Sequence, residues 1–463
     1  MSATEGIIAE RPVPGRPRRY EFPDTHRAVL ANGLRVVVTP MPGRELVAAS
    51  LAIRTGAADE PGAVAGATVL GARGLTEGTE LRDAIALTEA FERLGASMHA
   101  EAGWDAISAG LDVPASRLEP ALELLAEVVR RPSFPASEVD RLRDERLNDL
   151  IQAKADPRRR ADEAFVSSVY AESSPYRRPA GGTAETVAGL TSAELRAVHQ
   201  SVYGPEGAAL VVVGDVDPEA VTAMAGRLFG DWAGGRPDAP VPDAASAVEE
   251  RFIRVVHRPG SVQSEIRIGH PGIPRRHPDY HAVSVMSMIL GGLFNSRLMT
   301  NLREDKGYTY GAYAGFDLRR GAGPFSARAA VNTEVTVPSI REFLGELERI
   351  REAPVSAAEL AAAQNYLVGV FPLRFETPGP VAGSLAGLFV HDLPDDELVR
   401  YRAAIEAVRA DDVLRVAREH IHPERCAIVL VGDHDRIAGE LESAGIAPVE
   451  VVVDEPEASG HDR

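Results

Sequence analysis

Two polar side chains in the second half of the chain could stabilise negative charge on a bound molecule. Arg303 and Tyr310 stand seven residues apart in the segment LREDKGYTY. A guanidinium and a phenol can both donate hydrogen bonds to a carbonyl oxygen that gains negative charge. The alternative is that Arg303 pairs with a nearby carboxylate and Tyr310 packs within a sheet.

The residues around this pair predict a helix that is followed at once by a strand. A helix over residues 296–305 would bury an apolar face, and Gly307 would end it. Residues 308–313 would then continue as a strand. Such a reversal can bring Arg303 and Tyr310 to one point.

The chain also repeats itself once. The segment ALVVVGDVD at 209–217 matches AIVLVGDHD at 427–435, and a proline precedes each copy at the same offset. Each copy predicts a helix, a turn with proline, a buried apolar strand and a second helix. We therefore expect an α+β fold of two homologous α/β-sandwich domains, with antiparallel-rich mixed sheets covered by helices and related by internal duplication.

Amino-acid composition along the chain, above all the Pro-rich and polar segments, predicts the domain boundaries. The N-terminal segment is rich in Pro and Arg, the C-terminal segment is polar, and GGRPDAPVPDAASAVEE reads as a linker long enough to let two domains close on one another. Long helices are expected near 116–131, 136–153, 159–173, 337–352 and 356–370. The expected divisions are a disordered arm (1–24), a first domain (25–234), a linker (235–249), a second domain (250–453) and a disordered tail (454–463).

Charge and cysteine content exclude several classes of function. The 463 residues carry 50 basic and 68 acidic side chains, a net charge of −18, which disfavours binding to nucleic acid. No apolar stretch approaches the roughly 18 residues that a membrane span needs, and no signal-peptide pattern opens the sequence. We expect a cytoplasmic protein without a membrane partner. The single cysteine, Cys426, lies in an apolar run and is expected to be a buried structural thiol.

Several segments together resemble the pitrilysin / mitochondrial-processing-peptidase family of inverted-zincin metallopeptidases. The resemblance covers about residues 25–445 and rests on the twofold repeat and on four segments: ANGLRVVV, GARGLTEGT, GGTAETVAGLTSAEL and ILGGLFNSRLMTNLREDKGYTYGAYAGF. Active members of this family carry His-x-x-Glu-His on a helix, shortly before a Gly-Thr pair. The two histidines bind zinc, the glutamate acts as general base, and a later glutamate is the third ligand.

This chain departs from that pattern at every zinc position. Aligned on the Gly-Thr of GLTEGT, the ligand and base positions fall on Val69, Ala72 and Arg73, and the third ligand falls on Asp149. A lone aspartate cannot hold zinc, and Arg73 would repel a divalent cation. The resemblance therefore implies that this chain binds no catalytic zinc.

The same resemblance assigns a role to the intact Arg–Tyr pair. In the family, the matching side chains reach across a cavity to the substrate carbonyl beside the zinc. The expected function is the non-catalytic, substrate-binding half-shell of a heterodimeric zinc metallopeptidase, inactive alone, with Arg303 and Tyr310 supplied in trans. The expected partners are a zinc-containing subunit with His-x-x-Glu-His and an unfolded peptide substrate. The alternatives are an inactive structural scaffold of the same fold and a homodimeric peptide-binding protein.

The remaining histidine pairs look weaker as metal ligands. His277 and His281 stand four residues apart, a spacing that suits a metal, but the proline after His277 predicts a helix start there. His420 and His422 precede a proline in a turn and have no evident partners. The sequence predicts no metal site at these histidines.

Overall fold

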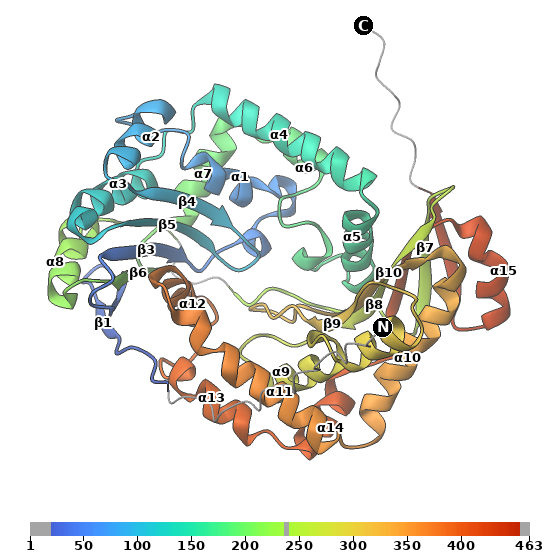
Figure 1. The fold of residues 1–463 in the computed structure, drawn as a ribbon. Helices are drawn as coiled ribbons and strands as arrows, with labels where there is room; N and C mark the ends of the chain where they lie inside the picture. The colour runs from blue at the N-terminus through green and yellow to red at the C-terminus, as the bar shows by residue number, and fades with distance from the viewer. Residues whose placement is uncertain (1–19, 236–239, 454–463) are drawn as a thin grey trace, which may run out of the picture.

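The computed structural model describes residues 20–235 and 240–453, and its first half is built around a mixed six-stranded sheet. The strands run in the order β1-β2-β6-β3-β5-β4 (Figure 1). Asn32 and Gly33 lie in the short loop that joins β1 and β2 as an antiparallel hairpin. The strand bounds are β1 His26–Val29, β2 Arg35–Pro40, β3 Leu46–Ile53, β4 Ser97–Ala102, β5 Ile107–Pro114 and β6 Ala208–Gly214.

The second half repeats this sheet with one change at its edge. Its order is β12-β7-β11-β8-β10-β9, so the duplicated apolar strands β6 and β11 occupy the same third position. The edge strands differ, because β1 is antiparallel to β2 whereas β12 is parallel to β7. The expected duplicated α+β fold is confirmed. The bounds are β7 Phe252–His257, β8 Gln263–Pro271, β9 Ala312–Phe316, β10 Pro324–Asn332, β11 Ala427–Gly432 and β12 Val449–Val453.

Helices of both halves follow the amphipathic segments of the sequence, and several begin at polar caps. Asp83 accepts a hydrogen bond from Ala86 N, and Ser356 with Glu359 forms a capping box. The helices of the first half are α1 Ala67–Gly74, α2 Ala84–Arg93, α3 Leu118–Arg130, α4 Ala136–Ala155, α5 Pro157–Val169, α6 Ala184–Ala188, α7 Ser192–Val202 and α8 Pro218–Phe229. Those of the second half are α9 Tyr280–Ser287, α10 Thr336–Glu352, α11 Ala357–Val370, α12 Pro378–Val390, α13 Glu397–Ala407, α14 Ala410–His420 and α15 His434–Ala444, with π-helices η5 Met288–Gly292 and η6 Met299–Asp305.

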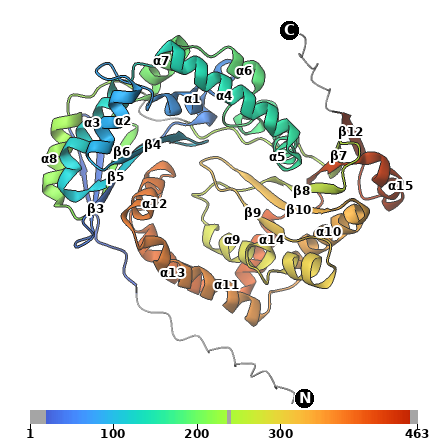
Figure 2. The same cartoon turned by 45° about the horizontal axis from the view of Figure 1, so that its top comes forward.

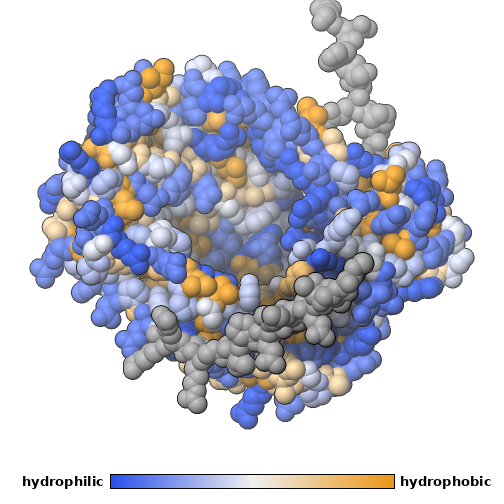
Figure 3. All heavy atoms as spheres, in the orientation of Figure 1, coloured by the Kyte–Doolittle hydropathy of each residue, from blue (hydrophilic) through white to orange (hydrophobic). Residues whose placement is uncertain are grey.

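Each half sends one helix onto the sheet of the other half. Helix α5 packs against β8 and β11, and helix α12 packs against β3 and β6 (Figures 1 and 2). Phe165 of α5 shares a buried cluster with Val429 of β11, and Leu385 of α12 shares one with Val211 of β6. The two halves therefore form one packed unit, and a hollow opens between them on the face shown in Figure 3.

The linker between the halves and the segment before β1 both pack against the rest of the protein. Ala171 N donates to Ala245 O (2.9 Å) and Ala247 N donates to Val169 O (3.0 Å), so the described part of the expected linker runs alongside the end of α5. Tyr20 and Phe22, expected in a disordered arm, pack against Phe375 of the second half. Residues 1–19 of that arm and the tail 454–463 lie outside the described residues.

The only cysteine of the chain is a buried packing residue, as the apolar run around it predicts. Cys426 Sγ donates to Pro423 O (3.3 Å), and burial raises the pKa of the thiol to about 12. A thiol of this kind is a poor nucleophile at neutral pH. Within residues 20–235 and 240–453, no helix is both long and apolar enough to cross a membrane.

Candidate functional site

The positions aligned with the zinc-binding helix lie on α1. Ala72 is fully buried there, Val69 is half-buried and Arg73 is exposed. Helix α1 packs against α4, and Arg73 Nη2 donates to Glu145 Oε2 of α4 (2.8 Å). An ion pair therefore bridges the two helices at the place where the alignment puts the second zinc-binding histidine.

Asp149, aligned with the third ligand, lies one turn after Glu145 on α4. Arg159 holds its carboxylate with two hydrogen bonds, Nη1 to Oδ1 (2.8 Å) and Nη2 to Oδ2 (3.0 Å), and Arg146 donates to it as well. These contacts, Arg159 first, hold the pKa of Asp149 below its usual value. Both oxygens of Asp149 are already bound to cationic groups.

The local charge around these positions does not suit a divalent cation. Burial lowers the pKa of Arg146, and the nearby positive charges of Arg159 and Arg73 lower it further. With no histidine at these positions and Asp149 already paired, the residues present do not fit zinc. Within residues 20–235 and 240–453, clusters of three side chains that could hold a metal occur only elsewhere, around Asp279 and around Asp433.

Arg303 lies within the π-helix η6. Its Nε is 3.4 Å from Glu304 Oε1, and its guanidinium carbon stands 4.8 Å from the centre of the exposed Phe294 ring. Such stacking orients the guanidinium while leaving its edge free to donate hydrogen bonds. Arg303 therefore lies beside a nearby carboxylate, as the alternative interpretation of the sequence stated, at a distance of 3.4 Å.

Tyr310 lies in a loop, and the expected strand over 308–313 begins only at Ala312. The reason is local: Thr309 Oγ1 donates to Ala330 O (2.7 Å) and accepts from Gly311 N (3.1 Å), which replaces sheet pairing at this point. The side chain of Tyr310 is 92% exposed. The alternative in which Tyr310 packs within the sheet is therefore wrong.

The reversal around Gly307 takes place, since its φ of 65° ends the helix as expected. In the described part of the chain, however, no hydrogen bond joins Arg303 to Tyr310. Tyr310 instead borders a cavity of about 310 Å³ that Arg303 does not line. The two side chains therefore have different neighbours: Phe294 and Glu304 lie beside Arg303, whereas Tyr310 borders the cavity.

Three arginines from different elements line the cavity beside Tyr310. Arg267 of β8, Arg328 of β10 and Tyr313 of β9 stand opposite one another in register across the sheet, and Arg158 comes from the first turn of α5. Arg267 is only 2% exposed, and it pairs with Asp162 and Glu265. Sequence reasoning missed this cleft, although an arginine within the apolar segment GPFSARAAV was a usable signal.

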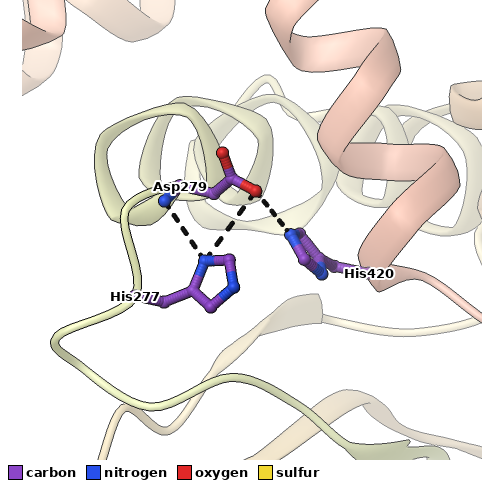
Figure 4. Close-up of side chains that lie close together, drawn as sticks. All are labelled: His277, Asp279 and His420. Carbon is purple, nitrogen blue, oxygen red and sulfur yellow. Dashed lines mark hydrogen bonds and ion pairs between the residues drawn. The ribbon is translucent and has the colours of Figure 1, made fainter.

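A second polar cluster joins the start of α9 to the end of α14 (Figure 4). Asp279 Oδ2 lies 2.8 Å from His420 Nε2 and 3.8 Å from His277 Nδ1. His420 is the last residue of α14, and Asp279 is its partner. The expectation that His420 lies in a turn without a partner is therefore wrong. His281 lies apart from this cluster, 3.7 Å from Glu397.

A guanidinium already balances the carboxylate of that cluster. Arg415 donates to both oxygens of Asp279, at 2.6 and 3.1 Å, and holds its pKa down at about 2, with His420 adding to the effect. His277 Nδ1 accepts the backbone N–H of Asp279 (3.2 Å). Asp279 and Nδ1 of His277 therefore already have hydrogen-bonding partners within the protein. Asp279 belongs to an ion-pair network that joins the start of α9 to the end of α14.

Two family models match successive stretches of the chain, and the second match begins within the first half. A family model described as "Insulinase (Peptidase family M16)" matches residues 35–180, and one described as "Peptidase M16 inactive domain" matches residues 189–367. The chain belongs to the peptidase M16 family. The resemblance derived from the sequence is confirmed, and the chain is a peptidase-like member of that family.

Relatives of this M16 chain align over nearly its whole length. A protein named "uncharacterized zinc protease" from Mycobacterium tuberculosis is 27% identical over 410 residues, covering 88% of this chain and 93% of the relative. A similarly named protein from Streptomyces coelicolor is 24% identical over 427 residues, covering 90% and 92%.

Solved structures agree with this assignment. A crystal structure titled as a peptidase M16 inactive domain from Pseudomonas fluorescens superposes with a TM-score of 0.83 at 26% identity, covering 89% of this chain and 98% of that one. A protease from Helicobacter pylori has a TM-score of 0.82 at 21% identity, covering 89% and 100%, and supports the fold alone.

Proposed function

We propose that this chain is the non-catalytic, substrate-binding subunit of a two-chain zinc metallopeptidase. A partner of the same family, carrying His-x-x-Glu-His, would hold the zinc. This chain would supply Arg303 and Tyr310 as hydrogen-bond donors to the carbonyl oxygen of the peptide bond that is cleaved. The zinc-protease names of its relatives support the reaction class.

The observation that carries the proposal is the contrast between the two sites. At the aligned zinc positions, Arg73 of α1 is paired with Glu145 of α4, and Asp149 of α4 is paired with Arg159 of α5. At the second site, the exposed side chain of Tyr310 projects from a loop fixed by Thr309. An exposed tyrosine on an ordered loop adds little to stability, so its presence favours a role in binding.

The decisive experiment combines this chain with a His-x-x-Glu-His relative from the same genome. Zinc content and cleavage of unstructured peptides are measured for each chain alone and for the mixture, after size-exclusion chromatography. We expect zinc in the partner only, and efficient cleavage only when the two chains co-elute. Zinc-dependent cleavage by this chain alone would contradict the proposal.

The variant Tyr310→Phe separates this role from that of an inactive scaffold. A scaffold would tolerate the loss of an exposed hydroxyl, whereas a substrate-binding subunit would still co-elute with its partner but lose cleavage. Full cleavage by an assembly that contains Tyr310→Phe would favour the scaffold.

A further inference from the structure

Two arginines in the cleft beside Tyr310 have no carboxylate partner among the residues that the structure describes. Arg158 and Arg328 are both exposed, both line the cavity of about 310 Å³, and neither side chain makes an ion pair or hydrogen bond with another described residue. They come from different halves of the chain, α5 and β10, so the fold itself brings these two cations together.

Neighbouring arginines show that carboxylate partners are otherwise supplied in this region. Arg159, next to Arg158 in the sequence, binds Asp149 through two hydrogen bonds. Arg267, opposite Arg328 in the sheet, pairs with Asp162 at 2.6 Å and Glu265 at 2.8 Å. Because the charge of Glu265 is taken up by Arg267, the open part of the cleft keeps a positive charge.

The cleft also has walls suited to a peptide. Tyr310 and Tyr313 present exposed rings with phenolic donors, and Gln263 adds a neutral amide. A carboxylate that enters between two guanidiniums is held by charge-assisted hydrogen bonds, which are stronger than neutral ones. Aromatic rings beside it provide contact area for the adjoining backbone.

We propose that this cleft binds a carboxylate of the substrate peptide, from either an acidic side chain or the chain end. This inference rests on the proposed function and makes it more specific, since the bound carboxylate lies next to the carbonyl that Tyr310 contacts. The net charge of −18 points the other way, towards basic peptides. At contact distance, however, the local cations dominate, because salt screens charges beyond about 8 Å.

The test measures peptide binding to the full chain without its partner, by fluorescence anisotropy. Three rhodamine-labelled peptides of one sequence are compared: a central Glu with an amidated end, a central Gln with an amidated end, and a central Gln with a free C-terminus. We expect the Glu peptide or the free-end peptide to bind about tenfold more tightly than the neutral peptide, a size consistent with a bidentate charged contact. Which of the two binds more tightly identifies the source of the carboxylate.

Arg158→Gln and Arg328→Gln should each remove most of that preference. Arg276→Gln is the matched control, because Arg276 is exposed, lies outside the cavity and makes no ion pair with a described residue. Circular dichroism and melting curves check that the variants fold. Equal binding of the three peptides, absence of binding, or an equal loss in the Arg276 control would each overturn the inference.

The same peptides distinguish failure of the carboxylate site from failure of the proposed subunit role. If the two-chain mixture cleaves peptides but shows no preference that depends on Arg158 or Arg328, the carboxylate site is wrong and the subunit role stands. If the preference is seen in binding while the mixture remains inactive, the subunit role fails and the carboxylate site stands.

Discussion

Arg267 Nε lies 2.6 Å from Asp162 Oδ1, and this contact joins strand β8 of the second half to helix α5 of the first. Arg267 also donates to the backbone oxygen of Arg158 at 3.3 Å, so it fixes the start of α5 over the sheet. One buried guanidinium therefore ties the two halves together and places one wall of the cleft beside Tyr310.

Removing this guanidinium should destabilise the fold strongly. Arg267→Met leaves Glu265 half-buried without its partner, and loss of one member of a buried ion pair typically costs about 3–5 kcal/mol. We expect a drop of several degrees or more in the melting temperature of the whole chain. Arg276→Met, at an exposed position, is the control, and equal melting temperatures for both variants would show that the Arg267 contacts add nothing.

Tyr310→Phe should lower turnover without lowering stability. Because Tyr310 is almost fully exposed, removing its hydroxyl should leave the melting temperature unchanged. Loss of one hydrogen-bond donor to a developing oxyanion, in contrast, typically costs on the order of a hundredfold in kcat. The measurement is kcat and KM of the assembled enzyme. Tyr366→Phe, at another exposed tyrosine, should leave both constants unchanged.

Arg303→Ala should affect the same step. Phe294 and Glu304 orient its guanidinium, and its removal takes away a second donor, with an expected loss of at least tenfold in kcat. Arg303→Lys should recover only part of this activity, because an ammonium does not reproduce the planar stack on Phe294. Normal kcat in Arg303→Ala and Tyr310→Phe together would remove both residues from the assigned role.

The sequence predicts the fold well wherever local signals agree. The repeat placed β6 and β11 at equivalent positions, and the helices α3, α4, α10 and α11 lie within two residues of their expected bounds. Helix α12 was not expected, because its segment PGPVAGSLAGLFV contains Pro and Gly residues that are typical of loops. Tertiary packing against β3 and β6 stabilises it despite these residues.

The candidate site, too, could be predicted from the sequence only in part. The motif alignment identified Val69, Arg73 and Asp149, and the structure places them on two neighbouring helices. The pairing of charges could not be predicted from the sequence: Arg158 and Arg159 are adjacent, yet among the described residues only Arg159 binds a carboxylate. Spatial partners that lie far apart along the chain decide which arginines remain available.

Restoring the zinc motif should not give an efficient enzyme. The triple variant Val69→His, Ala72→Glu and Arg73→His removes one guanidinium, but Asp149 stays bound to Arg159 and Arg146. A zinc ligand needs a free carboxylate and supporting contacts that orient it. We expect weak zinc binding in equilibrium dialysis and negligible cleavage by this chain alone. Adding Arg159→Ala should raise zinc affinity, because it frees one side of Asp149.

The network at Asp279 should stabilise the fold in a pH-dependent way. Arg415 and His420 lower the pKa of Asp279 from 3.8 to about 2, so the ionised carboxylate favours the folded state. Its contribution is fully present above about pH 4, the ordinary value, and is lost as the pH falls through about 2. Partial exposure limits the effect to the order of 1 kcal/mol.

Urea denaturation of wild type and Asp279→Asn at several pH values tests this directly. The variant should be less stable than wild type near pH 6, and the difference should shrink steadily between about pH 4 and pH 2, because the wild-type carboxylate becomes protonated there. Asp411→Asn is the control, because Asp411 is exposed in the first turn of α14, the helix that carries Arg415 and His420, and makes no ion pair with a described residue. A stability difference for Asp279→Asn that stays constant down to pH 2 would mean that packing, and not the ion pair with Arg415, accounts for its effect.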